Sequence, residues 1–348
     1  LLRRMGKRGI ALNQKRLESW QESLSKQLNT CFDICQQEGF NPGSNQQVGL
    51  ILAHRGTVLP MTKSKKQLCV NEEALSRLDD PLAAVVLAHR DASKLLGTYI
   101  RPWLGKERAS SHYRLDLATG RLASFDRNMQ NIPVDLRDIF VPDSGSWTDT
   151  DMSQVEMRIF AHISRDPTML NAYDTGEDIH WITQQALFPG TYRDNKAIRT
   201  CSKTFNFAMI FLAKEYTLAA HTGLPINLCA DLRRSWLSRY NIGYQWMIAQ
   251  TKREEPYAET LFGRRMRIPT LDEAHPEHIA KCRINYPIQG TAADLIKRAM
   301  LRTRHLDLAT QVHDELLFDG DVELDKQLNQ IHPDLYAPFE VRKGPVWS

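Results

Sequence analysis

Two pairs of carboxylates stand where strands are expected to end. Thr148–Met152 has the pattern of a short strand, and Asp149 and Asp151 lie two residues apart in it, so both side chains face one side. Asp314 and Glu315 stand at a turn between two apolar stretches. Mg²⁺ takes one or two carboxylates together with substrate phosphates, and two ions about 3.5–4 Å apart activate an attacking oxygen and stabilise a leaving one. A helix cap and a solvated hairpin tip are the more usual interpretations of such residues, so these residues alone leave metal binding open.

A second set of functional side chains recurs at every fourth residue. Arg199, Lys203, Phe207 and Phe211 form one slowly winding stripe on a helix, because each step of four residues drifts by only about 40°. Cations bind phosphates and aromatic rings stack on bases, so the stripe suits a surface that receives a nucleoside triphosphate. The alternative is that both Phe residues belong to the core and both cations are solvated.

The first third of the chain is predicted to be helical. Apolar side chains recur at steps of three and four over residues 17–35, which indicates an amphipathic helix. Asp80 and Pro81 have the types of an N-cap and a first helical residue, and a second long helix is expected through Leu96. The basic stretch 63–66 is either a solvated loop or a phosphate contact.

The elements that follow are mixed. Ser153–Glu156 has a capping-box pattern that opens a helix after the strand. Residues 195–220 are predicted to form another helix, and 277–305 a further one that is broken at Tyr286-Pro287. Residues 308–318 are predicted to form two short strands. Helices early, mixed elements late and few parallel βαβ signals favour the α+β class.

Composition describes an ordinary globular protein. The chain has 348 residues and a net charge of +4, with 42% hydrophobic and 25% charged residues. At about 150 residues per domain it has room for two to three domains, and no apolar run approaches the roughly 18–20 residues of a membrane helix. The six cysteines form no CxxC pair, which favours reduced thiols. The chain begins with Leu1 and no secretory leader follows, so we expect it to be part of a longer protein.

Six stretches, in this order, resemble the motifs of family A DNA polymerases, the DNA polymerase I type. They are Thr119–Leu122 with Asn128–Pro133, Asp151–Ser164 (motif A), Arg199–Phe211 (motif B), Glu259–Arg265, Gln289–Asp294 and Gln311–Glu315 (motif C). The resemblance covers nearly the whole chain. It implies an α+β right-hand fold with an antiparallel palm sheet, helical fingers and a helical thumb. The implied boundaries are 1–105 for the thumb with the start of the palm, 106–163 for the palm, 164–275 for the fingers and 276–348 for the palm again.

The resemblance implies a DNA-directed DNA polymerase, which adds dNTPs to a primer 3′ hydroxyl and releases pyrophosphate. Asp151 and Asp314 match the palm aspartates that hold two Mg²⁺ ions, with Mn²⁺ as a possible substitute, and Glu315 matches an acidic neighbour of secondary importance. Lys203 and Arg199 match the residues that hold the triphosphate.

The other implied residues surround the nucleotide and the primer end. The expected substrate-binding residues, beyond the two cations, are Gln154, Glu156, His180, Phe207 and Phe211. The residues expected near the primer end or the minor groove are Arg121, Asn285, Gln289 and His313. Within these sets, Glu156 matches a steric gate against a ribose 2′ hydroxyl, and His180 matches a further phosphate contact. Phe211 stands where the family usually has Tyr, so one hydroxyl is missing.

The implied partners are primer–template DNA and dNTPs, for a monomer that needs no membrane and works in a bacterial or viral-host cytoplasm or in an organelle. No exonuclease region is visible in the sequence, so we expect this chain neither to proofread nor to remove 5′ ends. Asp149 is an additional acid in a strand that is usually apolar, and we expect its side chain to be exposed to solvent. Two alternatives are a single-subunit RNA polymerase, which Glu156 argues against, and a non-catalytic primer–template clamp, which the presence of Asp151, Asp314 and Lys203 argues against.

Overall fold

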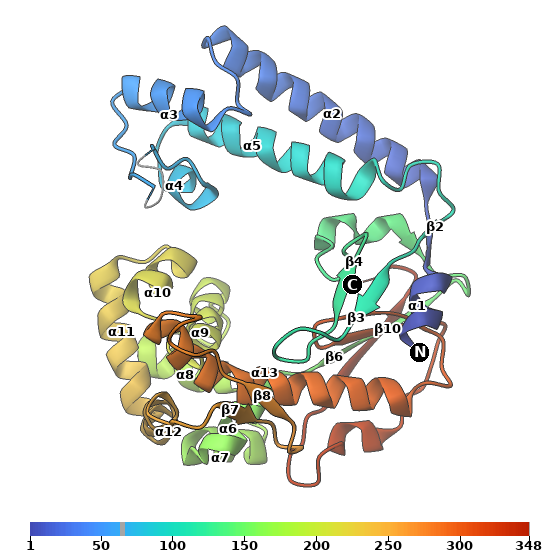
Figure 1. The fold of residues 1–348 in the computed structure, drawn as a ribbon, viewed down its shortest axis with the longest axis vertical. Coiled ribbons are helices and arrows are strands. Elements are labelled where there is room, and N and C mark those ends of the chain that lie inside the picture. Colours follow the sequence, from blue (N-terminus) through green and yellow to red (C-terminus); the bar gives the residue numbers. More distant parts are fainter. Residues whose placement is uncertain (63–66, 348) are drawn as a thin grey trace. The chain divides into compact units, whose positions relative to one another are not determined.

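The fold is described by a computed structural model that covers residues 1–62 and 67–347 (Figure 1). The basic stretch 63–66 lies outside the described residues. The chain divides into two compact units, each assembled from separate segments of the sequence. The first unit comprises Leu1–Gly9, Ser110–Asn131 and Pro142–Ser348, and the second comprises Ile10–Ala109 and Ile132–Val141.

Two long helices dominate the second unit. α2 (Gln14–Gln37) and α5 (Pro81–Leu95) lie side by side along most of their lengths (Figure 1). Four residues of the predicted stripe on α2 are buried, namely Leu17, Leu24, Cys31 and Cys35. Asp80 accepts a hydrogen bond from the Leu82 amide at the start of α5, so both helix predictions are confirmed. The remaining elements are α3 (Asn45–His54), α4 (Glu72–Ser76), the π-helical turn η1 (Leu96–Ile100), the 3₁₀ turn η2 (Val134–Ile139) and an antiparallel sheet, in the order β2 (Arg108–Ala109), β1 (Ile10–Leu12) and β5 (Phe140–Val141).

The first unit contains a four-stranded antiparallel sheet of order β11-β6-β10-β9. Its strands are β6 (Trp147–Met152), β9 (Leu308–Val312), β10 (Glu315–Asp319) and β11 (Phe339–Gly344). The predicted strand and the predicted pair of strands are therefore confirmed. In the sheet register, Glu315 on one side and Glu340 on the other flank Asp151, so the pairing brings distant carboxylates to one end of β6.

Helices and two hairpins complete the first unit. The helices are α1 (Leu2–Arg8), α6 (Val155–Ser164), α7 (Pro167–Thr175), α8 (Ile179–Leu187), α9 (Lys196–Met209), α10 (Glu215–Thr222), α11 (Ile226–Arg239), α12 (Asn241–Thr251), α13 (Pro276–Arg302) and the 3₁₀ turn η3 (Lys326–Gln330). The hairpins are β3 (His112–Arg114) with β4 (Ala123–Phe125), and β7 (Tyr257–Glu259) with β8 (Arg265–Arg267). One hydrophobic core runs from the sheet through α6, α8, α9 and α13. The α+β class is thus confirmed.

The helix predicted over 195–220 is interrupted. α9 ends at Met209, and Leu212 adopts a left-handed conformation with φ of 53° before α10 begins. Arg233 donates a hydrogen bond of 2.9 Å to the Ala213 carbonyl, which gives this backbone group a partner outside a helix. The stripe of four functional residues therefore loses its last member, Phe211, to the turn.

The predicted break in the last long helix does not occur. α13 continues through Pro287, which is buried. Proline inside a helix costs about 3 kcal/mol because one amide is missing and its ring crowds the preceding turn. Ile284 and Ile288 on either side are fully buried, and burial of each such side chain contributes roughly 1.5–3 kcal/mol. Packing of these side chains therefore offsets the tendency of proline to break a helix.

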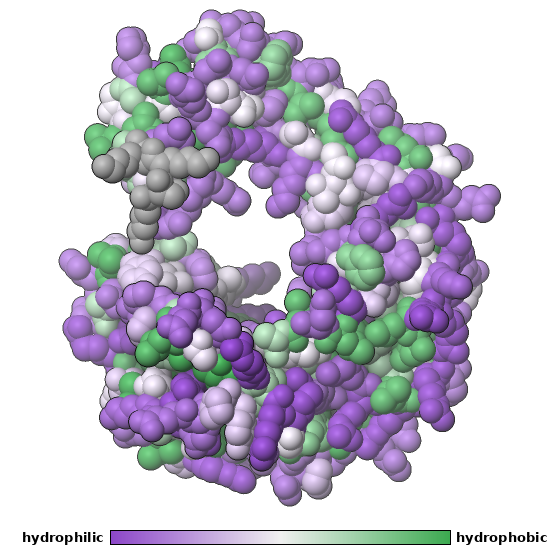
Figure 2. Space-filling model, in the orientation of Figure 1, coloured by the Kyte–Doolittle hydropathy of each residue, from purple (hydrophilic) through white to green (hydrophobic). Residues whose placement is uncertain are grey.

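The surface of the molecule is mostly hydrophilic on the face seen in Figure 2, with hydrophobic residues in small scattered groups. Among the described residues, no helix is both long and apolar enough to cross a membrane.

The β7–β8 hairpin is fixed to α13 by a partly buried ion-pair network. Asp294, only 7% exposed, receives Arg264 Nε at 2.8 Å, Lys297 Nζ at 3.1 Å and the Thr260 hydroxyl at 2.9 Å. Arg264 also donates to the carbonyls of Thr119 and Gly290. Removing one partner of such a network leaves a charge that is partly buried and uncompensated.

We therefore expect Asp294→Ala to lower the free energy of unfolding by about 3 kcal/mol, measured by urea denaturation. The matched control is Glu273→Ala, which breaks the pair with Arg267 at the surface and is expected to have little effect because exposed pairs are screened by water. Equal effects of the two substitutions would contradict this assignment of Asp294.

Candidate active site

Most of the predicted site residues meet in one cleft of the first unit, with a volume of about 860 Å³. The predicted residues that line it are Arg121, Asp151, Gln154, Glu156, His180, Arg199, Lys203, Phe207, His313 and Asp314. They come from the β3–β4 hairpin, the ends of β6 and β10, and the helices α6, α8 and α9. The cleft therefore has an acidic wall from the sheet and a basic wall from the helices.

The acidic wall is formed by the two aspartates. Asp151 ends β6, and Asp314 lies in the turn before β10, where its carbonyl accepts a hydrogen bond of 3.2 Å from the Met152 amide. Burial raises the pKa of Asp151 to about 6, and the negative charges of Asp314 and Glu340 add to the increase. Burial also raises the pKa of Asp314. Carboxylates crowded in this way disfavour their own ionisation, so a cation between them would stabilise the charged forms.

The donor set fits a hard divalent ion. Among the described residues, no group of three His, Cys, Asp or Glu side chains is placed to hold a metal by itself. Two carboxylates are what Mg²⁺ takes from a protein when phosphate and water supply the remaining oxygens. Asp151 and Asp314 thus suit an ion that binds together with a phosphate substrate.

Glu315 points to a different partner. Its carboxylate accepts a hydrogen bond from the indole nitrogen of Trp347, which is buried, and Glu315 does not line the cleft. Its neighbour Asp314 does. Asp314 precedes the first residue of β10, so the turn and not the alternation of the strand sets its direction. Of the two acids, only Asp314 lines the cleft.

β11 contributes two charged residues that sequence reasoning missed. Glu340 pairs with Asp151 in the sheet register, and Arg342 pairs with Asp149. Both line the cleft. The alternation of Phe339, Glu340, Val341 and Arg342 is the signal that marks a strand with one charged face.

The expectation that Asp149 is exposed to solvent is wrong. The residue is only 5% exposed, because β6 is an inner strand with a neighbour on each side. Its negative charge contributes to the raised pKa of Asp151.

Glu156 is held by an ion pair with Arg121, and both side chains lie in the cleft. Burial raises the pKa of Glu156, and the guanidinium of Arg121 opposes the increase. The predicted capping box is wrong, because Ser153 donates a hydrogen bond of 2.6 Å to Glu340 instead. The residue before α6 is Gln154, which is left-handed and accepts a hydrogen bond of 3.1 Å from the Tyr173 hydroxyl.

The basic wall consists of α9 with the start of α8. Arg199 and Lys203 project from α9, and Arg199 forms an ion pair with Asp178, the N-cap of α8. Lys203 Nζ lies 5.9 Å from the centre of the Phe207 ring. His180 is 3% exposed, and burial lowers its pKa to about 4, with the charges of Lys203 and Arg199 acting in the same direction. The ring is therefore neutral at pH 7.

The remaining predicted residues lie outside this cleft. Phe211 and Asn285 line a neighbouring cavity of about 540 Å³, which shares Lys203 and Phe207 with the cleft. Gln289 lies on α13 and lines neither space. His313 does line the cleft, at a left-handed position with φ of 52° in the turn before β10.

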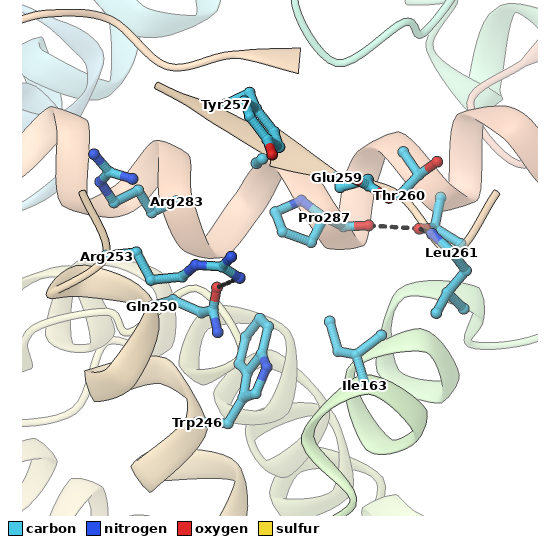
Figure 3. Close-up of a pocket in the computed structure, with 12 residues that line it drawn as sticks. Ile163, Trp246, Gln250, Arg253, Tyr257, Glu259, Thr260, Leu261, Arg283 and Pro287 are labelled. Carbon is cyan, nitrogen blue, oxygen red and sulfur yellow. Dashed lines mark hydrogen bonds between the residues drawn. The ribbon is translucent and has the colours of Figure 1, made fainter. Parts of the chain in front are cut away.

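A separate pocket of about 230 Å³ lies among α6, α12, the β7–β8 hairpin and α13 (Figure 3). None of the predicted site residues lines it. Figure 3 shows Arg253 hydrogen-bonded to Gln250, and the same guanidinium forms an ion pair with Glu255 at 2.9 Å. Arg283 donates to the Glu255 carbonyl. Because no predicted site residue lines this pocket, we assign the functional site to the cleft.

Comparison with known proteins gives a consistent result. DNA polymerase I of Geobacillus stearothermophilus is 30% identical over 383 residues, which cover 97% of this chain and 44% of the relative. DNA polymerase I of Chloroflexus aurantiacus is 33% identical over 393 residues, which cover 98% of this chain and 41% of the relative. The chain thus spans less than half the length of these relatives.

A solved structure is also similar. The POL domain of Pol1 from M. smegmatis, in complex with DNA primer-template and dNTP, matches with a TM-score of 0.84 and 27% identity over 99% of this chain and 68% of that one. The family model described as DNA polymerase family A matches residues 11–336. The fold, the ordered motifs and this match agree, and the chain belongs to DNA polymerase family A.

Proposed function

We propose that this chain is a DNA-directed DNA polymerase, which adds dNTPs to a primer 3′ hydroxyl under the direction of a template and releases pyrophosphate. The observation that carries the proposal is the two-walled cleft, with Asp151 and Asp314 on one wall and Arg199 and Lys203 on the other. Family membership supports the same chemistry. The Pol1 domain that resembles this chain binds DNA primer-template and dNTP, and we infer the same partners here, for a monomer.

In this proposal Asp151 and Asp314 would hold two Mg²⁺ ions, for which Mn²⁺ is a substitute. The chemistry that such ions supply when bound is activation of the attacking oxygen and neutralisation of charge on the phosphates. Lys203 and Arg199 bind the triphosphate, and positioning together with charge stabilisation accounts for most of the catalysis in phosphoryl transfer. Arg199 must exchange the Asp178 carboxylate for a phosphate oxygen when the nucleotide arrives.

Phe207 and Glu156 bound the part of the cleft that receives the sugar and the base. The Phe207 ring offers a stacking surface one helical turn after Lys203. Glu156 is half-buried and held by Arg121, so its carboxylate occupies a defined position where a ribose 2′ hydroxyl would collide. Gln154 lines the same cleft and accepts a hydrogen bond from Tyr173, and Phe211 lines the neighbouring cavity.

The primer end is assigned to Arg121, His313, Asn285 and Gln289. Donors of these types reach the N3 and O2 acceptors that every correct base pair presents in the minor groove, so they test pair geometry without reading sequence. We further propose that 1–105 form the thumb with the start of the palm, that 106–163 and 276–348 form the palm, and that 164–275 form the fingers. The second unit contains most of the proposed thumb.

Asp314→Ala is expected to abolish primer extension, because the carboxylate is central to charge neutralisation. We expect the rate of dNTP addition to fall by about a thousand-fold or more, the equivalent of several kcal/mol of transition-state stabilisation. The measurement is extension of a labelled primer on a DNA template with four dNTPs and Mg²⁺.

The matched control for this experiment is Glu315→Gln, at the adjacent position. Gln keeps an acceptor for the Trp347 indole, so we expect extension within about ten-fold of the parent. Extension by the parent and by Asp314→Ala at similar rates would refute the metal assignment. Primer–template binding without extension by any variant would refute the proposed activity.

The raised pKa of Asp151 predicts that the site destabilises the metal-free protein. Because the folded pKa of about 6 exceeds the ordinary 3.8, folding disfavours the ionised carboxyl, and the penalty grows as pH rises from about 4 to about 6 and is then constant. Asp151→Asn is therefore expected to stabilise the protein by about 1–2 kcal/mol at pH 8, after allowance for partial exposure.

At pH 4 the gain from Asp151→Asn is expected to be less than half as large, since the parent carboxyl is then largely protonated in the folded state. Urea denaturation in EDTA at both pH values measures the difference. A stabilisation that does not change with pH would contradict the titration of Asp151, and a loss of stability at pH 8 would contradict its sign.

Glu156→Ala is expected to increase the incorporation of ribonucleotides relative to deoxyribonucleotides, by about 10–200-fold, because it removes the group that excludes a 2′ hydroxyl. The matched control is Glu156→Gln, which keeps the volume and a hydrogen-bond acceptor for Arg121 and is expected to keep discriminating. Steady-state kcat/KM for dNTP and rNTP pairs measures the preference. An unchanged preference in the Ala variant, or ribonucleotide use by the unmodified chain, would refute the gate.

A further inference from the structure

A buried hydrogen-bond network lies behind the basic wall of the cleft, among α8, α9 and α11. Asn206 is at its centre and is fully buried. Its side chain lies 2.9 Å from His180 Nδ1, 2.8 Å from Trp236 Nε1 and 2.9 Å from the Thr183 hydroxyl. The network therefore joins a cleft residue to two side chains of the core.

The orientation of the Asn206 amide follows from Trp236. An indole N–H can only donate, so the Asn206 atom that faces it must be the oxygen Oδ1. The Asn206 amide nitrogen Nδ2 then faces His180. Because an amide NH₂ group also only donates, His180 Nδ1 must be an unprotonated acceptor.

The proton of the neutral His180 ring is consequently on Nε2. This atom is buried and has no hydrogen-bond partner among the described residues, although the ring belongs to the lining of the cleft. A buried donor without a partner costs about 1–3 kcal/mol. Such a cost is accepted at sites where a ligand supplies the acceptor. Nε2 is covered in this structure, so side chains over it must shift when the ligand enters.

The charged groups around His180 keep the ring neutral. Asp178, at the N-cap of its own helix, favours the imidazolium, whereas Lys203 and Arg199 from α9 oppose it together with burial. Trp236 and Thr183 carry no charge. The net effect is a pKa of about 4, so the ring is neutral between pH 6 and pH 8.

We propose that Asn206, oriented by Trp236, is a positioning residue that fixes His180 as the neutral Nε2–H tautomer and thereby makes it a hydrogen-bond donor to a phosphate oxygen of the incoming nucleotide. This inference deepens the proposed function and rests on it for the identity of the ligand. The tautomer itself rests on the contacts alone, so the two parts can fail separately.

The tautomer is tested by NMR of the whole chain with ¹⁵N-labelled histidine, since the two ring nitrogens have distinct shifts when protonated and unprotonated. His180→Gln identifies the His180 signals by their absence. We expect a proton on Nε2 and none on Nδ1 from pH 6 to pH 8. A proton on Nδ1 in the parent would overturn the proposal, whether or not the chain extends primers.

Asn206→Asp tests the positioning role, because a carboxylate beside Nδ1 accepts a hydrogen bond and draws a proton there. We expect Nδ1 to become protonated in both the neutral and the charged ring. The matched control is Thr183→Val, which removes another contact of Asn206 but leaves Trp236 in place, so its His180 should keep the parent tautomer. If Asn206→Asp does not alter the proton position, the role assigned to Asn206 is wrong.

Kinetics separates this role from simple loss of structure. In Asn206→Asp we expect KM for dNTP to rise about ten-fold at pH 8, with a smaller change in kcat, because the neutral ring no longer donates from Nε2. At pH 6 the imidazolium regains the Nε2 proton, and the increase in KM should shrink. Thr183→Val should show no such pH dependence. A KM increase that is equal at both pH values would overturn the donor role.

If Asn206→Asp does not fold, Trp236→Phe replaces it, since Phe keeps an aromatic ring at this position, although a smaller one, and lacks the N–H that orients Asn206. We expect signals of both tautomers in that variant. A single Nε2–H form there would overturn the assignment to Trp236. Absence of primer extension by the parent would refute the proposed function while leaving the tautomer result valid.

Discussion

The pairing of β6 with β10 is the constraint on which the candidate site depends. Antiparallel register places the end of one strand beside the start of the other, and in this sheet it sets Asp151 next to the turn that holds Asp314. A slip of one residue would turn every side chain to the opposite face. The apolar side chains of both strands are buried, so the hydrophobic core fixes the register and, through it, the separation of the two carboxylates.

The same strand pairing lowers the stability of the folded chain, because it brings several acidic side chains together. Asp149, Asp151, Asp314 and Glu340 are gathered at one end of the sheet, and their mutual repulsion adds to the effect of burial on the pKa of Asp151. Few natural cores concentrate acids in this way without a cation or hydrogen-bond donors to balance them. The arrangement is reasonable if divalent cations that bind together with the nucleotide balance the charge, which is the condition under which the proposed reaction takes place.

The sequence was sufficient to predict the helices and strands whose patterns are local. Periodicity identified α2 and α5, and the types of Asp80 and Pro81 located a helix start correctly. Tertiary packing decided the cases in which prediction failed. α13 continues through Pro287 because the neighbouring side chains are buried. Ser153 does not cap α6 as predicted, because its hydroxyl donates a hydrogen bond to the carboxylate of Glu340, from a strand far along the chain.

The candidate site shows the same division between local and distant information. Motif spacing predicted Arg199, Lys203 and Phe207 on α9, together with Asp151 and Asp314 at the sheet, and these five residues lie in one cleft. Glu340 and Arg342 were missed because their position beside Asp151 depends on sheet order, which a single sequence does not specify. Asn206 was passed over because a buried Asn beside Phe207 has no chemical signature until its partners on α8 and α11 are known.

Two cations of the cleft that could bind phosphate are already in ion pairs with carboxylates of the protein. Arg199 is paired with Asp178 and Arg121 with Glu156, so a nucleotide that binds to either cation competes with a carboxylate of the protein. Competition of this kind lowers affinity for any single phosphate, because breaking each pair leaves a partly buried charge without its partner. A complete triphosphate with its cations can replace several contacts at once. Under the proposed function, we therefore expect the pairing of the cleft residues with one another to favour the whole ligand over its fragments.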